Sequence, residues 1–150
     1  MRIVLAVDGS SYAEEAVRSV VTRPWPAGTT VRVLSAIKIT AVLPPSAELP
    51  GVTEAAETPG NNEIRAQTGR LVEEVAERLR SAGLSAEAVV REGDPRSVIV
   101  DEAKYWAADL IVVGSHGHTG IPHWLLGNVA QSVVAHATCS VEVVRRPAEE

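Results

Sequence analysis

The sequence predicts an α/β protein in which a five-stranded parallel sheet lies between two layers of helices. Five short apolar runs alternate with four segments of helical periodicity, which is the pattern of a three-layer α/β/α fold. The runs are continuously apolar, as strands covered on both faces require. The chain has 150 residues, of which 45% are hydrophobic, so it is sized for one domain with a substantial core. We therefore treat residues 1–150 as a single domain.

The first two strands are expected at residues 3–7 and 31–37, because both runs are rich in Val, Ile and Leu. The helix between them is expected to start at Ser11, since Ser11 and Glu14 have the spacing of a capping box. Apolar residues then recur at helical intervals until Pro24 ends the pattern. The chain thus begins as strand, polar turn, helix and strand.

Residues 40–62 lose this periodicity. They contain four prolines, two glycines and three glutamates, a composition typical of a flexible loop. The alternative is a lid, because the second strand ends where a ligand of such a sheet binds. The sequence favours the flexible loop.

The second half of the chain continues the alternation. In order, we expect a long amphipathic helix ending at Gly83, a strand at 86–91, a helix with Asp94 as N-cap and Pro95 at its first position, a strand at 110–113, a helix to about residue 137 and a strand at 141–144. The apolar face of the last helix is expected to contain Leu126, Val129, Val133 and Val134. This alternation, with right-handed crossovers, fits the strand order 3-2-1-4-5.

In that order the first and fourth strands flank the switch point of the sheet, where ligands bind beyond the strand ends. The first strand leads into Asp8, and the fourth leads into a loop with Gly114, Gly117 and Gly127. Glycines permit positive φ and close approach of backbone N–H groups, and a helix N-terminus attracts anions, so the expected ligand contains phosphate. The alternative is structural: Gly114 and Gly117 only turn a connection, and Gly127 only packs against a neighbour.

These residues resemble the universal stress protein family. The resemblance rests on an Asp after the first strand, a long variable segment after the second, the spacing Gly114-x2-Gly117-x9-Gly127 and a closing Val-rich strand. It covers nearly the whole chain and implies a Rossmann-like fold of the adenine nucleotide alpha hydrolase-like type. It also implies an adenine nucleotide ligand, either ATP or AMP or ADP, with any Mg²⁺ carried by the phosphates.

The resemblance implies nine site residues: Val7, Asp8, Ala36, Gly114, His116, Gly117, Gly127, Asn128 and Val129. Asp8 would accept hydrogen bonds from the ribose hydroxyls, and Val7 and Ala36 would contact adenine. The glycines and Val129 would bring N–H groups to the phosphates, and the His116 imidazole would reach a phosphate. The structural alternatives are a turn role for Asp8, core positions for Val7 and Ala36, and an exposed loop histidine without a role for His116.

Asn128 departs from the family pattern, which has Ser or Thr at this position in the ATP-binding branch. A hydroxyl both donates and accepts hydrogen bonds, and it caps a helix. The Asn side chain also donates and is an equally good N-cap, but it is bulkier. We expect nucleotide binding to survive in weakened form.

Composition argues against several other classes of function. The net charge of −5 and the lack of any Lys or Arg run longer than two residues argue against nucleic-acid and anionic-membrane partners. No apolar run has membrane length. The single cysteine, Cys139, excludes an intrachain disulfide and a multi-cysteine zinc site, so we expect a cytoplasmic protein.

His116, His118 and His123 are close in sequence, but a pliable glycine loop is a poor metal site, and we expect no bound metal ion there.

Three functions remain open. The first is a regulatory nucleotide-binding protein of the stress response. The second is a slow ATPase or adenylate-transferring enzyme, although neither Ser10 nor Ser115 has an evident base partner and we name no catalytic residue. The third is a dimeric scaffold without nucleotide. The resemblance implies a homodimer through the edge strand at 141–144 (Val141, Glu142, Val143, Val144), while the alternative is an edge covered by the C-terminal tail.

Overall fold

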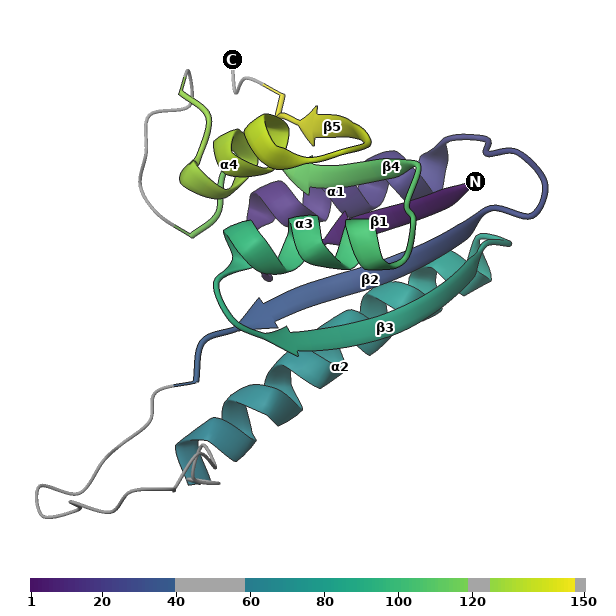
Figure 1. The fold of residues 1–150 in the computed structure, drawn as a ribbon. Helices are drawn as coiled ribbons and strands as arrows, with labels where there is room; N and C mark the ends of the chain where they lie inside the picture. Colours follow the sequence, from purple (N-terminus) through teal and green to yellow (C-terminus); the bar gives the residue numbers. More distant parts are fainter. Residues whose placement is uncertain (40–58, 119–124, 148–150) are drawn as a thin grey trace, which may run out of the picture.

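The computed structural model describes residues 1–39, 59–118 and 125–147, and it has the predicted alternation of strands and helices (Figure 1). The elements are β1 (Arg2–Ala6), α1 (Ser11–Thr22), β2 (Thr30–Ile37), α2 (Pro59–Ser81), β3 (Ser85–Glu92), α3 (Pro95–Tyr105), β4 (Leu110–Gly114), α4 (Asn128–His136) and β5 (Ser140–Val144). All strand pairs are parallel, and their order is β3-β2-β1-β4-β5. The predicted fold class and strand order are confirmed.

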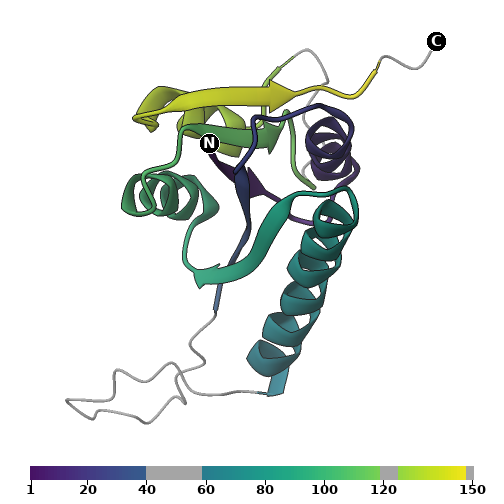
Figure 2. The ribbon, with the colours of Figure 1, turned by 90° about the vertical axis from the view of Figure 1, so that its right-hand side faces the viewer.

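The sheet separates two hydrophobic cores (Figure 2). On one face α1 and α2 pack against side chains such as Ile3, Leu5 and Val112, which are fully buried. On the other face α3 and α4 pack against Val4 and Ile111. Successive residues of a strand point to opposite faces, so the continuous apolar runs supply both cores.

The helix starts follow from local hydrogen bonds. Asp94 is the N-cap of α3, and its side chain accepts from the Arg96 N–H at 2.9 Å, with Pro95 following as predicted. The cap of α1 is Ser10 rather than Ser11: the Ser10 Oγ accepts from the Ala13 N–H at 3.1 Å. The predicted capping box was wrong by one residue, because Ser10 retains extended backbone angles and Ser11 is already helical.

The helix α2 starts at Pro59, so the last four residues of the predicted loop at 40–62 are helical. Proline is well tolerated in the first helical turn. The first turns of α2 project beyond the sheet (Figures 1 and 2), where most side chains are exposed and apolar periodicity gives no signal. The rest of the predicted loop, 40–58, lies outside the described residues.

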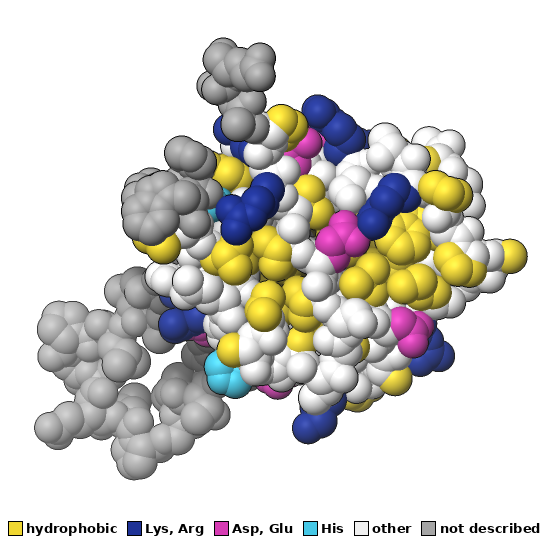
Figure 3. Space-filling view, turned by 90° about the horizontal axis from the view of Figure 1, so that it is seen from above, with side chains coloured by type: hydrophobic (Ala, Val, Ile, Leu, Met, Phe, Trp, Pro, Cys, Tyr) yellow, Lys and Arg dark blue, Asp and Glu magenta, His cyan; other side chains and the backbone are white. Residues whose placement is uncertain are grey.

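The buried face of α4 differs from the predicted one. Ala130 and Val133 are buried, whereas Val134 is 51% exposed. One residue turns a helix by about 100°, so a helix that buries Val133 points Val134 outward. Figure 3, viewed toward β5 and α4, shows groups of hydrophobic side chains at this surface between basic (Lys or Arg) and acidic side chains. Within the described residues, no helix is long and apolar enough to cross a bilayer.

Candidate functional site

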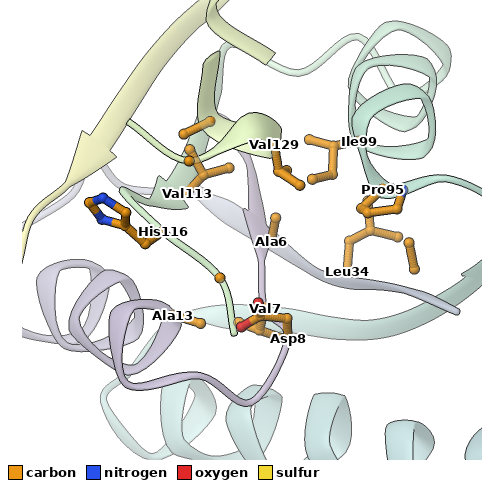
Figure 4. Close-up of a pocket in the computed structure, with 15 residues that line it drawn as sticks. Ala6, Val7, Asp8, Ala13, Leu34, Pro95, Ile99, Val113, His116 and Val129 are labelled. Atoms are coloured by element: carbon orange, nitrogen blue, oxygen red, sulfur yellow. The ribbon is translucent and has the colours of Figure 1, made fainter. Parts of the chain in front are cut away.

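A cleft opens at the carboxyl ends of β1 and β4, where the sequence placed the switch point (Figure 4). Its empty space, including the open mouth, is about 610 Å³. The lining comprises Ala6, Val7, Asp8, Ala13, Leu34, Ala36, Pro95, Ile99, Val113, Gly114, His116, Gly117, Gly127, Val129 and Ala130. Strand ends, the first turns of α3 and α4 and the glycine loop thus meet around one space.

Eight of the nine predicted site residues line this cleft, and Asn128 is the exception. Asn128 is exposed and is the first residue of α4. The N-cap is Gly127, so the expectation that the Asn128 side chain caps the helix was wrong. The position after the third glycine therefore contributes helical backbone, and its side chain lies outside the cleft lining.

Asp8 has a turn role and also faces the glycine loop. Its Oδ1 accepts a hydrogen bond from the Ser10 N–H at 2.9 Å, the pattern of an Asx turn. Its Oδ2 lies against Gly117, where a Cβ atom would be 3.0 Å away. Across the same gap, the His118 Nε2 lies 2.7 Å from the Asp8 carbonyl oxygen. These contacts bring the loop after β1 and the loop after β4 together.

The three loop glycines permit close approach rather than unusual backbone angles. None of them has positive φ, so that part of the sequence expectation was wrong. A Cβ atom on Gly114 would lie 2.7 Å from the backbone carbon of Tyr12, and one on Gly127 would lie 3.1 Å from the His116 Cα. The positive φ is found at Gly9, in the turn after β1. Gly114 and Gly127 therefore pack against neighbouring backbone, which the structural alternative proposed for Gly127 but not for Gly114.

The N-terminus of α4 faces the cleft, and its N-cap residue is a glycine. Val129 and Ala130 line the cleft, and Gly127 has no side chain with which to make a capping hydrogen bond. The N–H groups of a first helical turn have no partner within the helix, and the helix dipole adds partial positive charge. This arrangement suits an anion.

The His116 imidazole is buried, so the alternative of an exposed loop histidine was wrong. It is 6% exposed, and its centroid lies 4.7 Å from that of the Tyr12 ring. Figure 4 shows the ring pointing away from Val7 and Val129. The ring thus packs against Tyr12 of α1, and a contact between the imidazole and a phosphate stays a prediction.

His116 also provides a partner that the sequence did not suggest for Ser115. The Ser115 Oγ lies 2.8 Å from the His116 Nδ1. A hydroxyl beside an imidazole is the arrangement of an activated nucleophile. Ser115 is only 1% exposed, however, and it does not line the cleft. The Ser115 hydroxyl of this pair therefore lacks access to a ligand in the cleft.

Charged side chains lie at the rim beside Pro95. The Arg96 guanidinium contacts both carboxylate oxygens of Asp94, at 3.0 and 2.7 Å. These hydrogen bonds, the Arg96 backbone N–H and the nearby Lys38 charge hold the pKa of Asp94 well below its usual range. Asp94 is therefore ionised and satisfied by Arg96. Among the described residues, no group of three His, Cys, Asp or Glu side chains could hold a metal ion, and His123 lies outside them.

Seven lining residues were not predicted as site residues: Ala6, Ala13, Leu34, Pro95, Ile99, Val113 and Ala130. They are apolar, and in the sequence they are indistinguishable from core residues. The available signal is position, since they lie near strand ends or in the first turns of helices. For Pro95 and Ile99, position in the sequence is not enough, because their place in the cleft depends on the packing of α3 over β2 next to the switch point.

A sequence model of the universal stress protein family matches residues 1–145. The chain belongs to this family. Among its sequence relatives, universal stress protein YxiE of Bacillus subtilis is 34% identical over 84 residues, which are 56% of this chain and 57% of that protein. Universal stress protein MJ0531 of Methanocaldococcus jannaschii is 43% identical over 68 residues, 45% of this chain and 40% of that protein. The chain spans about half the length of the curated relatives it matches.

Solved structures of universal stress proteins share this fold over nearly the full chain. The structure of MJ0577 from Methanocaldococcus jannaschii has a TM-score of 0.82 at 26% identity and covers 99% of this chain and 97% of that one. A family protein from Arabidopsis thaliana, solved with AMP bound, has a TM-score of 0.68 at 21% identity, with coverage of 100% and 94%. A universal stress protein in complex with cAMP has a TM-score of 0.64 at 24% identity, with coverage of 97% and 96%. At these identities, the similarity to the AMP-bound and cAMP-bound structures establishes a shared fold only.

Proposed function

We propose that this universal stress protein binds an adenine nucleotide, namely ATP, ADP or AMP, and acts as a regulatory protein of the stress response. The observation that supports this most is the meeting of Asp8, the glycine loop and the N-terminus of α4, whose N-cap is Gly127, in one cleft. A nucleotide needs an acceptor for its ribose, N–H donors for its phosphates and an apolar surface for its base, and the cleft offers all three. Family members with AMP and cAMP bound support the same ligand class.

In this proposal each part of the ligand has its own surroundings. Adenine lies against the apolar lining near Val7, Leu34 and Ala36. The ribose hydroxyls donate to the Asp8 Oδ2, since its Oδ1 is occupied by Ser10. The phosphates, with any Mg²⁺, lie at the backbone of the glycine loop and of the first turn of α4, which includes Asn128 and Val129.

The direct test is to purify the protein under mild conditions, denature it and identify any released nucleotide by chromatography and mass spectrometry. Thermal unfolding provides a second measurement, since a ligand at about 100 times its dissociation constant adds roughly 2.7 kcal/mol to stability. We expect adenine nucleotides, and not guanine nucleotides, to raise the melting temperature. Stripped protein that responds to no adenine nucleotide would contradict the proposal.

Asp8→Asn tests the ribose contact without removing the turn. The Asn side chain can still accept from the Ser10 N–H, but it presents an amide donor in place of Oδ2. Because a hydrogen bond to a charged group is lost, Asp8→Asn should bind the nucleotide about tenfold or more weakly than the wild type, as measured by calorimetry. Asp101→Asn, at an exposed position of α3, is the charge-matched control and should bind as the wild type. Equal affinity of both variants would remove Asp8 from the site.

Binding, rather than turnover, is the proposed role, since the Ser115 hydroxyl is buried. Nucleotide recovered intact after long incubation supports a regulator, and multiple-turnover phosphate release supports the slow ATPase or adenylate-transfer alternative. A folded dimer without nucleotide supports the scaffold alternative. We further propose a homodimer through β5 and a cytoplasmic location without a nucleic-acid partner, in keeping with one cysteine and a net charge of −5.

A further inference from the structure

We propose that the cleft selects among nucleotides by charge and favours an adenosine nucleotide with a single phosphate group over ATP. This inference rests on the proposed nucleotide site and specifies its substrate class. It starts from the ionisable side chains of the described lining, which are only Asp8 and His116. No lysine or arginine belongs to that lining, and the Lys38 charge lies near Asp94 at the rim.

Two arginines that lie next to residues of the lining or of α1 have other partners. At one rim Arg96 makes its two contacts with Asp94. After β5, the Arg146 Nη1 lies 3.2 Å from the Ser11 Oγ, and its guanidinium lies 5.6 Å from the centroid of the Tyr12 ring. Tyr12 in turn packs against the buried His116 ring, so Arg146 contacts α1 on the side to which that ring points. A phosphate that recruited either arginine would have to compete with these contacts.

The loop sequence adds no cation. Residues 118–126, between the second and third glycines, contain two histidines and no lysine or arginine. Asn128, the next polar residue, is uncharged. The positive potential at the phosphates therefore comes from backbone N–H groups and from the helix α4, whose N-terminus is equivalent to about half a unit charge.

This positive potential compensates the negative charge of one phosphate group better than that of three. Each additional phosphate brings negative charge without gaining a cationic partner from the described lining. The Asp8 carboxylate, 3.0 Å from the Cβ position of Gly117, adds a negative charge at the same loop. Like charges at short range in a partly enclosed site repel strongly. AMP and cAMP satisfy the N–H donors with less uncompensated charge than ATP does.

Calorimetry on nucleotide-stripped protein tests this order. We measure AMP, cAMP, ADP and ATP at low ionic strength with a chelator present, so that no divalent cation screens the phosphates. The tighter of AMP and cAMP should bind at least about tenfold more strongly than ATP, a difference that salt should reduce because it screens charge. Comparing the affinities for AMP and cAMP shows whether the cleft favours an open or a cyclic monophosphate. The affinity for ADP should lie between that of the tighter monophosphate and that of ATP.

Asn128→Lys supplies a cation at the start of α4, and Gln131→Lys supplies the same charge at an exposed position one turn later. Asn128→Lys should raise the affinity for ATP more than that for AMP, and so narrow the ratio of the two dissociation constants by about threefold or more. Gln131→Lys should leave this ratio nearly unchanged, because Coulomb energy falls with distance. ATP binding as tightly as AMP and cAMP without divalent cations would overturn the charge selection and leave the nucleotide site intact. Failure of all four ligands to bind would overturn the nucleotide site and this inference together.

Discussion

The three glycines of the loop share a motif but meet different neighbours. Gly114 lies against the backbone of Tyr12, Gly117 against the end of the Asp8 side chain, and Gly127 against the backbone of His116. A flexible carboxylate can move by a few tenths of an ångström, whereas the first turn of α1 cannot move without disturbing the sheet. The same substitution should therefore act on stability at Gly114 and mainly on the Asp8 carboxylate at Gly117.

Gly114→Ala should destabilise the fold. Its Cβ atom would lie 2.7 Å from the Tyr12 backbone carbon, closer than van der Waals contact permits. Overpacking of this kind costs about 1–3 kcal/mol in the free energy of unfolding, measured by urea denaturation. Gly69→Ala is the matched control, because Gly69 lies inside α2 with nothing within 4 Å of its Cβ position, and it should stabilise by up to about 1 kcal/mol. Unchanged stability of Gly114→Ala would contradict the close approach of β4 and α1.

At the scale of elements, α3 is attached to the sheet by a buried carboxylate. Glu102 is 6% exposed, and its oxygens lie 2.9 Å from the Arg32 Nη1 of β2 and 3.0 Å from the Arg91 Nε of β3. The Arg32 guanidinium also lies 4.5 Å from the centroid of the Trp106 ring, at the end of α3. Because Pro95 and Ile99 of the same helix line the cleft, this cluster helps to hold one wall of the site.

Glu102→Ala should be strongly destabilising. It leaves Arg32, whose side chain is only 15% exposed, without its buried partner. Removing one member of a buried ion pair costs about 3–5 kcal/mol, measured as the free energy of unfolding in urea. Glu87→Ala removes the other partner of Arg32, a carboxylate that is 48% exposed, and should cost no more than about 1 kcal/mol. Similar costs for the two variants would mean that burial does not set the strength of this cluster.

At the scale of the molecule, β5 is an edge strand that pairs only with β4 among the described strands. Its residues 141–144 are half-buried, and the neighbouring α4 exposes Val134. Hydrophobic groups are visible on this face in Figure 3. An exposed apolar edge invites pairing with a second copy, and this supports the proposed homodimer.

Val143→Lys should convert the dimer to a monomer in light scattering, because it places a charge on the edge strand. Val143 also packs against the α3 and α4 core, so circular dichroism must show that the fold is retained. Val134→Lys changes an exposed side chain beside β5 and is the second variant, while Ser81→Lys, at the exposed end of α2, is the control. A wild type with the mass of one chain, or a mass unchanged in both valine variants, would exclude this interface.

The sequence by itself determined the fold class, the strand order and the location of the cleft. Apolar runs, helical periodicity and the Asp94-Pro95 start signal are local properties, and parallel sheets place their ligands at the switch point. Asp8 and the glycines could therefore be assigned to one site before any contact was known. The same local signals missed the start of α2 at Pro59, because its first turns are exposed and have no apolar stripe.

Only the tertiary structure decided how the predicted site residues are oriented and buried. The burial of His116 against Tyr12, its contact with Ser115 and the outward position of Asn128 depend on how the loop packs against α1 and α4. The apolar lining, including Ile99, comes from elements far apart in the chain. A sequence pattern records which residue types are present, but side-chain direction and burial are set by neighbours that meet only when the sheet is assembled.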